Sequence, residues 1–179
     1  VEQSLVDSRG DFCGSQIRLD REIFMDLVVT TMGSLFEDTV GSSEAGSFIS
    51  LVGLAVGEKI QEEYLQVSGA SQLDRKGMVD ALLDMKQRIG SDFYVMDESE
   101  QRIVLGNKRC PFGELAKKCP SLCMLTANVC GHLAAESQGY ARVDLPETIA
   151  AGASECRVVI NLDPNTTGSG RRYHRRAWA

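Results

Sequence analysis

The chain has 179 residues, 43% of them hydrophobic, and a formal net charge of −6 with a pI near 5.0. This length is sufficient to bury a core as one domain, and the acidic balance argues against a nucleic-acid surface on the domain itself. The apolar runs are much shorter than the roughly 20 residues of a membrane span, so we expect no membrane partner. The first residues do not show the basic-then-hydrophobic order of a secretory signal, which favours a cytoplasmic setting.

Charge is distributed unevenly along the chain. Four arginines fall within the last nine residues, so the remainder is more acidic than the total indicates. Arginine beside Tyr173 and Trp178 could dock on an acidic partner or on RNA. Because Gly168 and Gly170 precede this segment, the simpler prediction is that residues 164–179 are a flexible basic tail.

The first half of the chain reads as helical. After an irregular lead-in over residues 1–19, apolar residues recur at spacings of three and four in three successive segments. The pattern predicts helices over about 20–41, 43–67 and 74–89, the first with Asp20 as its N-cap. On the second helix, Gly53 and Gly57 lie four residues apart, which favours tight packing within the domain over a dimer seam.

The hydrophobic period then changes from helical to extended. Two short β-prone runs, 93–96 and 102–105, flank a polar segment and predict an antiparallel hairpin with a loop of about four to six residues. Further strands are expected over 141–145 and 155–162. The predicted fold class is α+β, with a layer of about three N-terminal helices followed by a small antiparallel sheet and a cysteine-bearing helix.

These expectations divide the chain into a few parts. Residues 20–163 form a single cysteine-rich domain, helical over 20–90 and mixed over 91–163. The lead-in contains Cys13, which stands nearly a hundred residues from the other cysteines and is expected to be a bystander.

Four of the six cysteines lie between residues 110 and 130. Pro111 restricts Cys110 to an extended backbone, so its thiol is presented from a strand end. Proline suits the first position of a helix, so Cys119 before Pro120 predicts a helix start with Cys123 one turn inside. Amides at this start, together with the following helix dipole, would favour the thiolate form of Cys119.

Clustered thiols in a reducing compartment bind metal or do redox chemistry more often than they form structural disulfides. Soft thiolates suit zinc or an iron–sulfur cluster. The spacing matches neither the paired cysteines of zinc ribbons nor the ferredoxin run, so the metal is undecided. A low-pKa thiol at Cys119 would alternatively serve a redox enzyme, but the only histidines to act as bases are His132 and His174, and we assign no catalytic residue.

Several segments of the second half resemble the methanogen output domain, a small sensory or output module of prokaryotic signalling proteins. The residues that carry the resemblance are 102–107, 110–113, 120–126, 139–141, 147–150 and 156–158. The Cys-Pro-Phe … Leu-Cys … Cys pattern is also similar to the C-terminal part of iron–sulfur transcriptional regulators and, more distantly, to 4-vinyl reductase sensor domains. The resemblance extends over most of residues 20–163.

The resemblance implies a set of shared thiols: Cys110, Cys123 and Cys156. Cys119 and Cys130 depart from the family pattern, so the fourth metal ligand is open, with Cys119 preferred and Cys130 the alternative. The implied function is a non-catalytic sensory module of signal transduction that holds zinc or an iron–sulfur cluster. A homodimer is expected, with a sensor kinase or transcriptional regulator as a further partner.

Two other functions stay open at this point. The domain could instead be a sensor for a hydrophobic small molecule with a structural zinc, or a cysteine-dependent redox enzyme. No DNA-binding helix-turn-helix is evident, so the regulator analogy implies a sensor half alone.

Overall fold

The computed structural model describes residues 20–176 and confirms the α+β class. Three helices, α1 (Arg21–Val40), α2 (Ser42–Ser68) and α3 (Arg75–Arg88), precede a five-stranded antiparallel sheet of order β1-β2-β4-β3-β5. The strands are β1 (Phe93–Ser99), β2 (Arg102–Asn107), β3 (Tyr140–Glu147), β4 (Cys156–Asn161) and β5 (Arg171–His174). Between β2 and β3 lie the helix α4 (Leu115–Lys118), the 3₁₀ turn η2 (Pro120–Leu122) and the long helix α5 (Cys123–Gln138).

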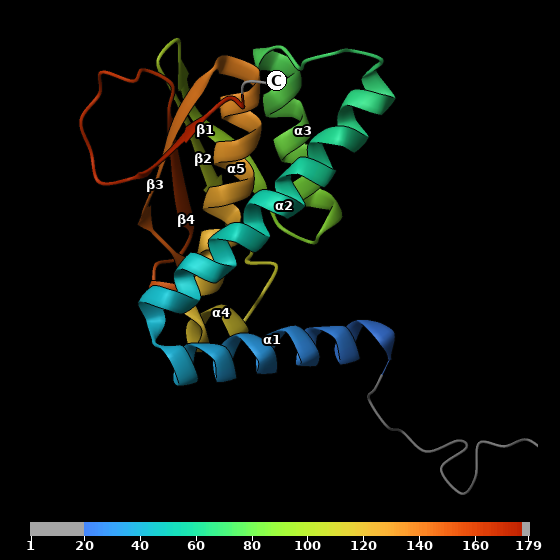
Figure 1. The fold of residues 1–179 in the computed structure, drawn as a ribbon, viewed down its shortest axis with the longest axis vertical. Coiled ribbons are helices and arrows are strands. Elements are labelled where there is room, and N and C mark those ends of the chain that lie inside the picture. Colours follow the sequence, from blue (N-terminus) through green and yellow to red (C-terminus); the bar gives the residue numbers. More distant parts are fainter. Residues whose placement is uncertain (1–19, 177–179) are drawn as a thin grey trace, which may run out of the picture.

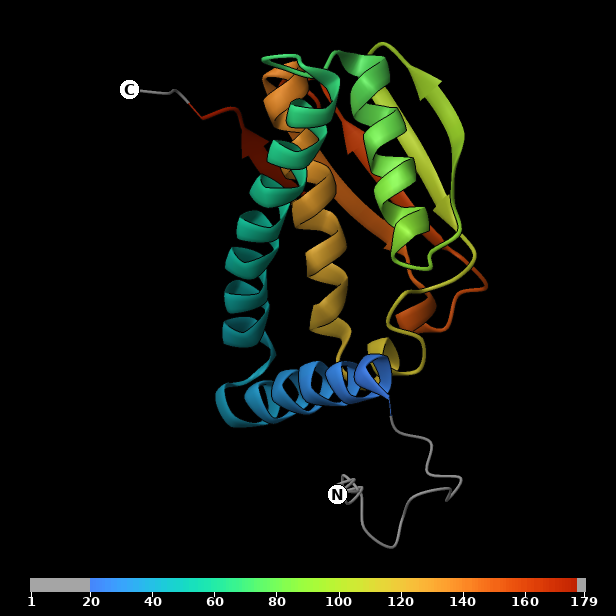
Figure 2. The same ribbon diagram turned by 90° about the vertical axis from the view of Figure 1, so that its right-hand side faces the viewer.

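The helices form layers on one side of the sheet. Helices α3 and α5 cover its inner face, α2 packs on α5, and α1 lies crosswise at the end of the domain beside α4 (Figures 1 and 2). The inner face is apolar because alternate residues of neighbouring strands pair there, as Ile103, Ile160 and Val143 do. Within residues 20–176, no helix combines the length and apolar character of a membrane span.

The hairpin of β1 and β2 is tighter than the sequence indicates. Ser99 pairs with Arg102, so the turn consists of residues 100–101 alone, and the expected loop of four to six residues is wrong. The polar residues Asp97 and Glu98 belong to β1 itself. Strand β1 is the edge of the sheet, so its polar side chains point into water at no desolvation cost.

The arginine-rich end is a strand where a flexible tail was expected. Strand β5 pairs with β3, and Tyr173 is buried against Gly131 of α5 with its hydroxyl donating to Asn128 Oδ1 at 3.1 Å. The Arg175 guanidinium donates to the last carbonyls of α5, 2.9 Å from the oxygen of Glu136. Arg175 and the buried Tyr173 therefore hold the chain end to α5, although the segment is polar in composition.

Helices α2 and α5 approach closely at two glycines. A Cβ atom on Gly53 would lie 2.8 Å from Cβ of Asn128, and one on Gly57 would lie 3.2 Å from Cδ2 of His132. The preferred interpretation of these glycines, tight packing within the domain, is confirmed.

This contact makes a matched pair of variants informative. We predict that Gly53→Ala lowers the free energy of unfolding by about 1–3 kcal/mol, because the added methyl group overpacks the α2–α5 contact. Gly46→Ala on the same helix meets no atom within 4 Å and should raise stability by about 0.5–1 kcal/mol through helix propensity. Urea unfolding measures both, and equal effects at the two positions would contradict the packing.

Candidate functional site

The site begins at the end of the β2–β4 ladder. Asn107, the last residue of β2, pairs with Cys156, the first residue of β4. The buried Asn107 side chain accepts hydrogen bonds from the amides of Asp92, at 3.0 Å, and Arg109, at 3.2 Å. Its carboxamide therefore fixes the loop that leaves β2, and Cys110 follows within this loop.

Cys110, Cys123 and Cys156 come together at this end of the sheet, and we call these three residues the thiol cluster. They come from the loop after β2, the start of α5 and the start of β4, and each is partly buried. Burial, followed by the charges of Cys156 and Cys110, raises the pKa of the Cys123 thiol to about 11. The thiols are therefore close enough to influence one another electrostatically.

A short 3₁₀ turn, η3 (Ile149–Ala151), covers the cluster on the strand side. The amide of Ile149 donates to Cys156 Sγ at 3.3 Å, and Thr148 hydrogen-bonds to Cys123. Burial raises the pKa of the Cys156 thiol, and the Ile149 hydrogen bond opposes this effect. The sequence segment 147–150 thus has a structural role in supporting two of the three thiols.

Lys86 is a buried cation that the sequence reading overlooked. It is 3% exposed, and its ammonium donates to Thr126 Oγ1 at 3.4 Å and lies 5.2 Å from the centroid of the Phe93 ring. Burial lowers the pKa of Lys86, whereas the charges of Cys130, Cys110 and Cys156 raise it. Its position four residues after Leu82, on the apolar face of α3, was the available signal.

Cys119 does not join the thiol cluster. It is fully buried under α1, and its thiol donates to Glu37 Oε2 at 3.1 Å. Burial, followed by the Glu37 carboxylate, raises the pKa of Cys119 to about 11. The expectation of a low-pKa thiol here is wrong, because burial and the carboxylate that faces the sulfur raise the pKa by more than the amides of Ser121 and Leu122 lower it.

The other cysteines and histidines have different surroundings. Cys130 is fully buried in the core, close to Lys86. His132 packs against Gly57, and burial lowers its pKa, as expected of a packing histidine. His174 lies edge-on to Tyr140. Cys13 falls outside the residues that the structure describes.

The thiol cluster does not form a closed metal site as its residues are placed. Across residues 20–176, no three histidine, cysteine, aspartate or glutamate side chains are grouped so that they could hold one metal ion. The donor chemistry of three thiols suits a soft metal, but the sulfurs would have to draw closer together.

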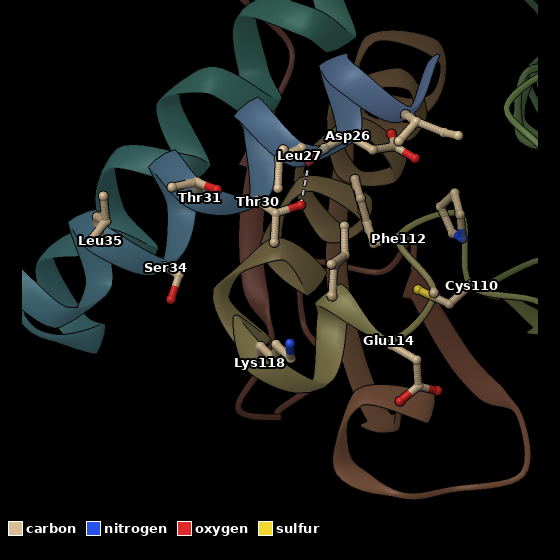
Figure 3. A pocket seen from close by; sticks show the side chains of 14 residues that line it. Asp26, Leu27, Thr30, Thr31, Ser34, Leu35, Cys110, Phe112, Glu114 and Lys118 are labelled. Carbon is tan, nitrogen blue, oxygen red and sulfur yellow. Dashed lines mark hydrogen bonds between the residues drawn. The ribbon is translucent and has the colours of Figure 1, made fainter. Parts of the chain in front are cut away.

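A cavity of about 710 Å³ adjoins Cys110. It lies between α1 and residues 110–118, with Leu27 and Thr31 on the helix side and Phe112 on the loop side (Figure 3). Cys110 stands at one end, and Lys118 stands near the other (Figure 3). Cys110 therefore belongs to both the cavity wall and the thiol cluster.

Helix α1 rests lightly on this part of the domain. Thr30 is its one buried residue, and a second cavity of about 140 Å³ lies beneath it, next to Phe112 and Leu122. The hydrogen bond from Cys119 to Glu37 is a polar contact that connects α1 to the rest of the domain.

The Glu37 contact predicts a pH dependence. Burial alone would raise the pKa of the Glu37 carboxyl, but hydrogen bonds from Cys119, Ser42 and Ser121 outweigh it and hold the pKa below the ordinary 4.5. A depressed carboxyl pKa contributes stability that is complete above the unfolded value and is lost as the pH falls through the folded value. We expect the unfolding free energy of the wild type to drop below about pH 4.5 more steeply than that of Glu37→Gln. Parallel curves in urea titrations from pH 6 to 3 would count against the contact.

The chain is similar to a known protein family and to a solved structure. A family model described as methanogen output domain 1 matches residues 27–161, which include the whole thiol cluster. A search of curated proteins finds no match. Among solved structures, trafficking protein particle complex subunit 3 from Naegleria fowleri, covalently bound to palmitic acid, aligns with a TM-score of 0.52 and 15% identity. The alignment covers 87% of this chain and 99% of that chain, and it indicates a shared fold.

Proposed function

The chain belongs to the methanogen output domain 1 family, and from this premise we propose that it is a non-catalytic sensory module that receives its signal at the thiol cluster. Membership of the family suggests a sensory or output domain. The observation that carries the proposal is the position of Cys110, which lines the cavity and interacts with Cys123 and Cys156. A change at these thiols would reach α1 directly, because α1 forms the opposite wall of the cavity.

In the first form of this proposal, the signal is a thiophilic centre, either zinc or an iron–sulfur cluster. Three thiols from three separate segments converge, and the ammonium of Lys86 beside them would offset part of the negative charge of thiolates. Such a centre would require the sulfurs to move closer together, and its fourth ligand would come from outside the three. Cys119 would have to leave Glu37 to serve, and Cys130 would have to leave the core.

In the second form, the signal is a hydrophobic small molecule in the cavity beside Cys110. The cavity has the volume of a small-molecule site, and much of its lining is apolar. The structurally similar trafficking subunit holds palmitic acid covalently, which supports a lipid-like ligand in this fold. Native mass spectrometry of the purified chain tests this form, because a bound acyl chain adds a defined mass. Cys110→Ser should reduce the fraction of chains that carry this added mass.

The enzyme alternative loses its main support. It required a reactive thiol at Cys119, and that thiol is buried with a raised pKa.

A signal at the thiol cluster would pass through α1 to a twin subunit, and from there to a kinase or regulator.

The first form makes a direct prediction. On protein purified without oxygen, we expect metal, with acid-labile sulfide and a broad absorption near about 400 nm if the centre is iron–sulfur. Replacing Cys110 and Cys123 together by serine should abolish metal binding, because two of the three thiols are lost. The control Cys13→Ser should retain the wild-type metal content.

Metal retained in the double variant would refute the assignment of the thiol cluster. Zinc without colour would indicate a structural centre. Absence of metal in the wild type, with free thiols, would leave the hydrophobic ligand as the signal.

A further inference from the structure

Helix α1 has its acidic residues on the side that faces the domain. With about 100° between successive residues, its acidic residues Glu22, Asp26, Glu37 and Asp38 all lie within about 80° of the buried Thr30. Two of these acidic residues have partners or neighbours there, since Glu37 bonds Cys119 and Asp26 lines the cavity. An isolated surface helix shows the reverse arrangement, with charges toward water.

The opposite side of α1 is apolar and exposed. Phe24, Met25, Met32 and Leu35 lie more than about 110° from Thr30, and Met32 is 66% exposed. Met25 and Leu35 stand at the borders of this side, since each also lines one of the two cavities under α1. The apolar surface continues onto the first half of α2, where Leu51 is also 66% exposed. A tilted contact between the rings of Phe36 and Phe48, with centroids 5.0 Å apart, joins the two helices. We call the combined surface the outer face; its members are Phe24, Met25, Met32, Leu35, Phe48, Leu51, Val52 and Val56.

The size of the outer face matches a protein interface. Its eight half-exposed side chains would remove on the order of 500 Å² of apolar surface from water per copy if covered. A standard interface buries about 800 Å² per partner, of which somewhat over half is apolar. The outer face therefore provides the apolar share of one such interface.

Charge on the two helices limits what can cover them. Residues 21–68 contain eight acidic residues against Arg21 and Lys59. Helices that lie on a membrane surface carry lysine and arginine to bind anionic lipid, so these helices are unsuited to that role. A second copy of the chain supplies an equally apolar face with no unmatched charge at its centre.

We propose that a second copy of this chain docks on the outer face, so that α1 is shared between the partner and the cavity of Cys110. This proposal depends on the proposed function in one respect only, which is that α1 transmits the signal. The inner side of α1 lines the cavity and its outer side holds the partner. A ligand that displaces α1 therefore changes the affinity of the two copies, and dimerisation changes ligand affinity by the same factor.

Sedimentation of the full chain tests the docking surface. We expect the wild type to be dimeric at about 50 µM, and Met32→Glu combined with Leu51→Glu to weaken association by at least about 100-fold. The matched control Val67→Glu introduces the same charge at a residue of α2 that is 86% exposed and distant from the outer face, and it should stay dimeric. Circular dichroism checks that the variants are folded. Hydrogen exchange tests the same surface on the wild type, without any substitution. Exchange over residues 21–56 should slow as the wild-type concentration rises, whereas exchange over β1 should not.

The proposal is overturned if the wild type is monomeric at this concentration, or if the double variant remains a dimer. A monomer that co-sediments with phosphatidylcholine–phosphatidylserine vesicles would assign the outer face to a membrane instead. Metal and ligand content measured on the same samples keeps the two proposals separate, because loss of the dimer leaves the three thiols in place.

Discussion

The antiparallel pairing of β2 with β4 is the constraint on which the candidate site depends. Its register places Asn107 opposite Cys156, and the Asn107 carboxamide then fixes the loop that carries Cys110. A slip of one residue would turn Cys156 to the other face of the sheet. Val158 and Ile160 lie on the same face of β4 as Cys156 and oppose such a slip, because it would also expose them to water. Core packing therefore fixes the positions of the thiols.

Helix α1 is the least embedded of the α-helices around this site. Only one residue of α1 is buried, cavities lie on the inner side of this helix, and its outer side is apolar and exposed. A helix held this weakly can change position at a low free-energy cost, which is the property required of an element that transmits a signal. The same property explains why the proposed partner and the proposed ligand would influence each other.

The sequence predicted the order of helices and strands up to β4 because the apolar periods are strong. Cys110, expected at a strand end, lies in the loop that begins after Asn107. The sequence could not predict the surroundings of the Cys119 thiol. They depend on how α1 crosses the domain, which is a long-range feature with no local signal in the sequence. Lys86 was detectable on the apolar face of α3. Strand β5 was hidden by its arginines, since Tyr173 is a single apolar anchor whose recess at Gly131 lies on another element.

The central claim is that Cys110, Cys123 and Cys156 form one site, and phenylarsine oxide tests it most directly because one arsenic atom bridges two neighbouring thiols. The reduced chain would be treated with one equivalent and alkylated, and the modified cysteines identified by peptide mass spectrometry. The account predicts that two of these three cysteines are protected together, while Cys119 is unaffected. Full alkylation of all three, or protection of a pair that includes Cys119, would contradict it.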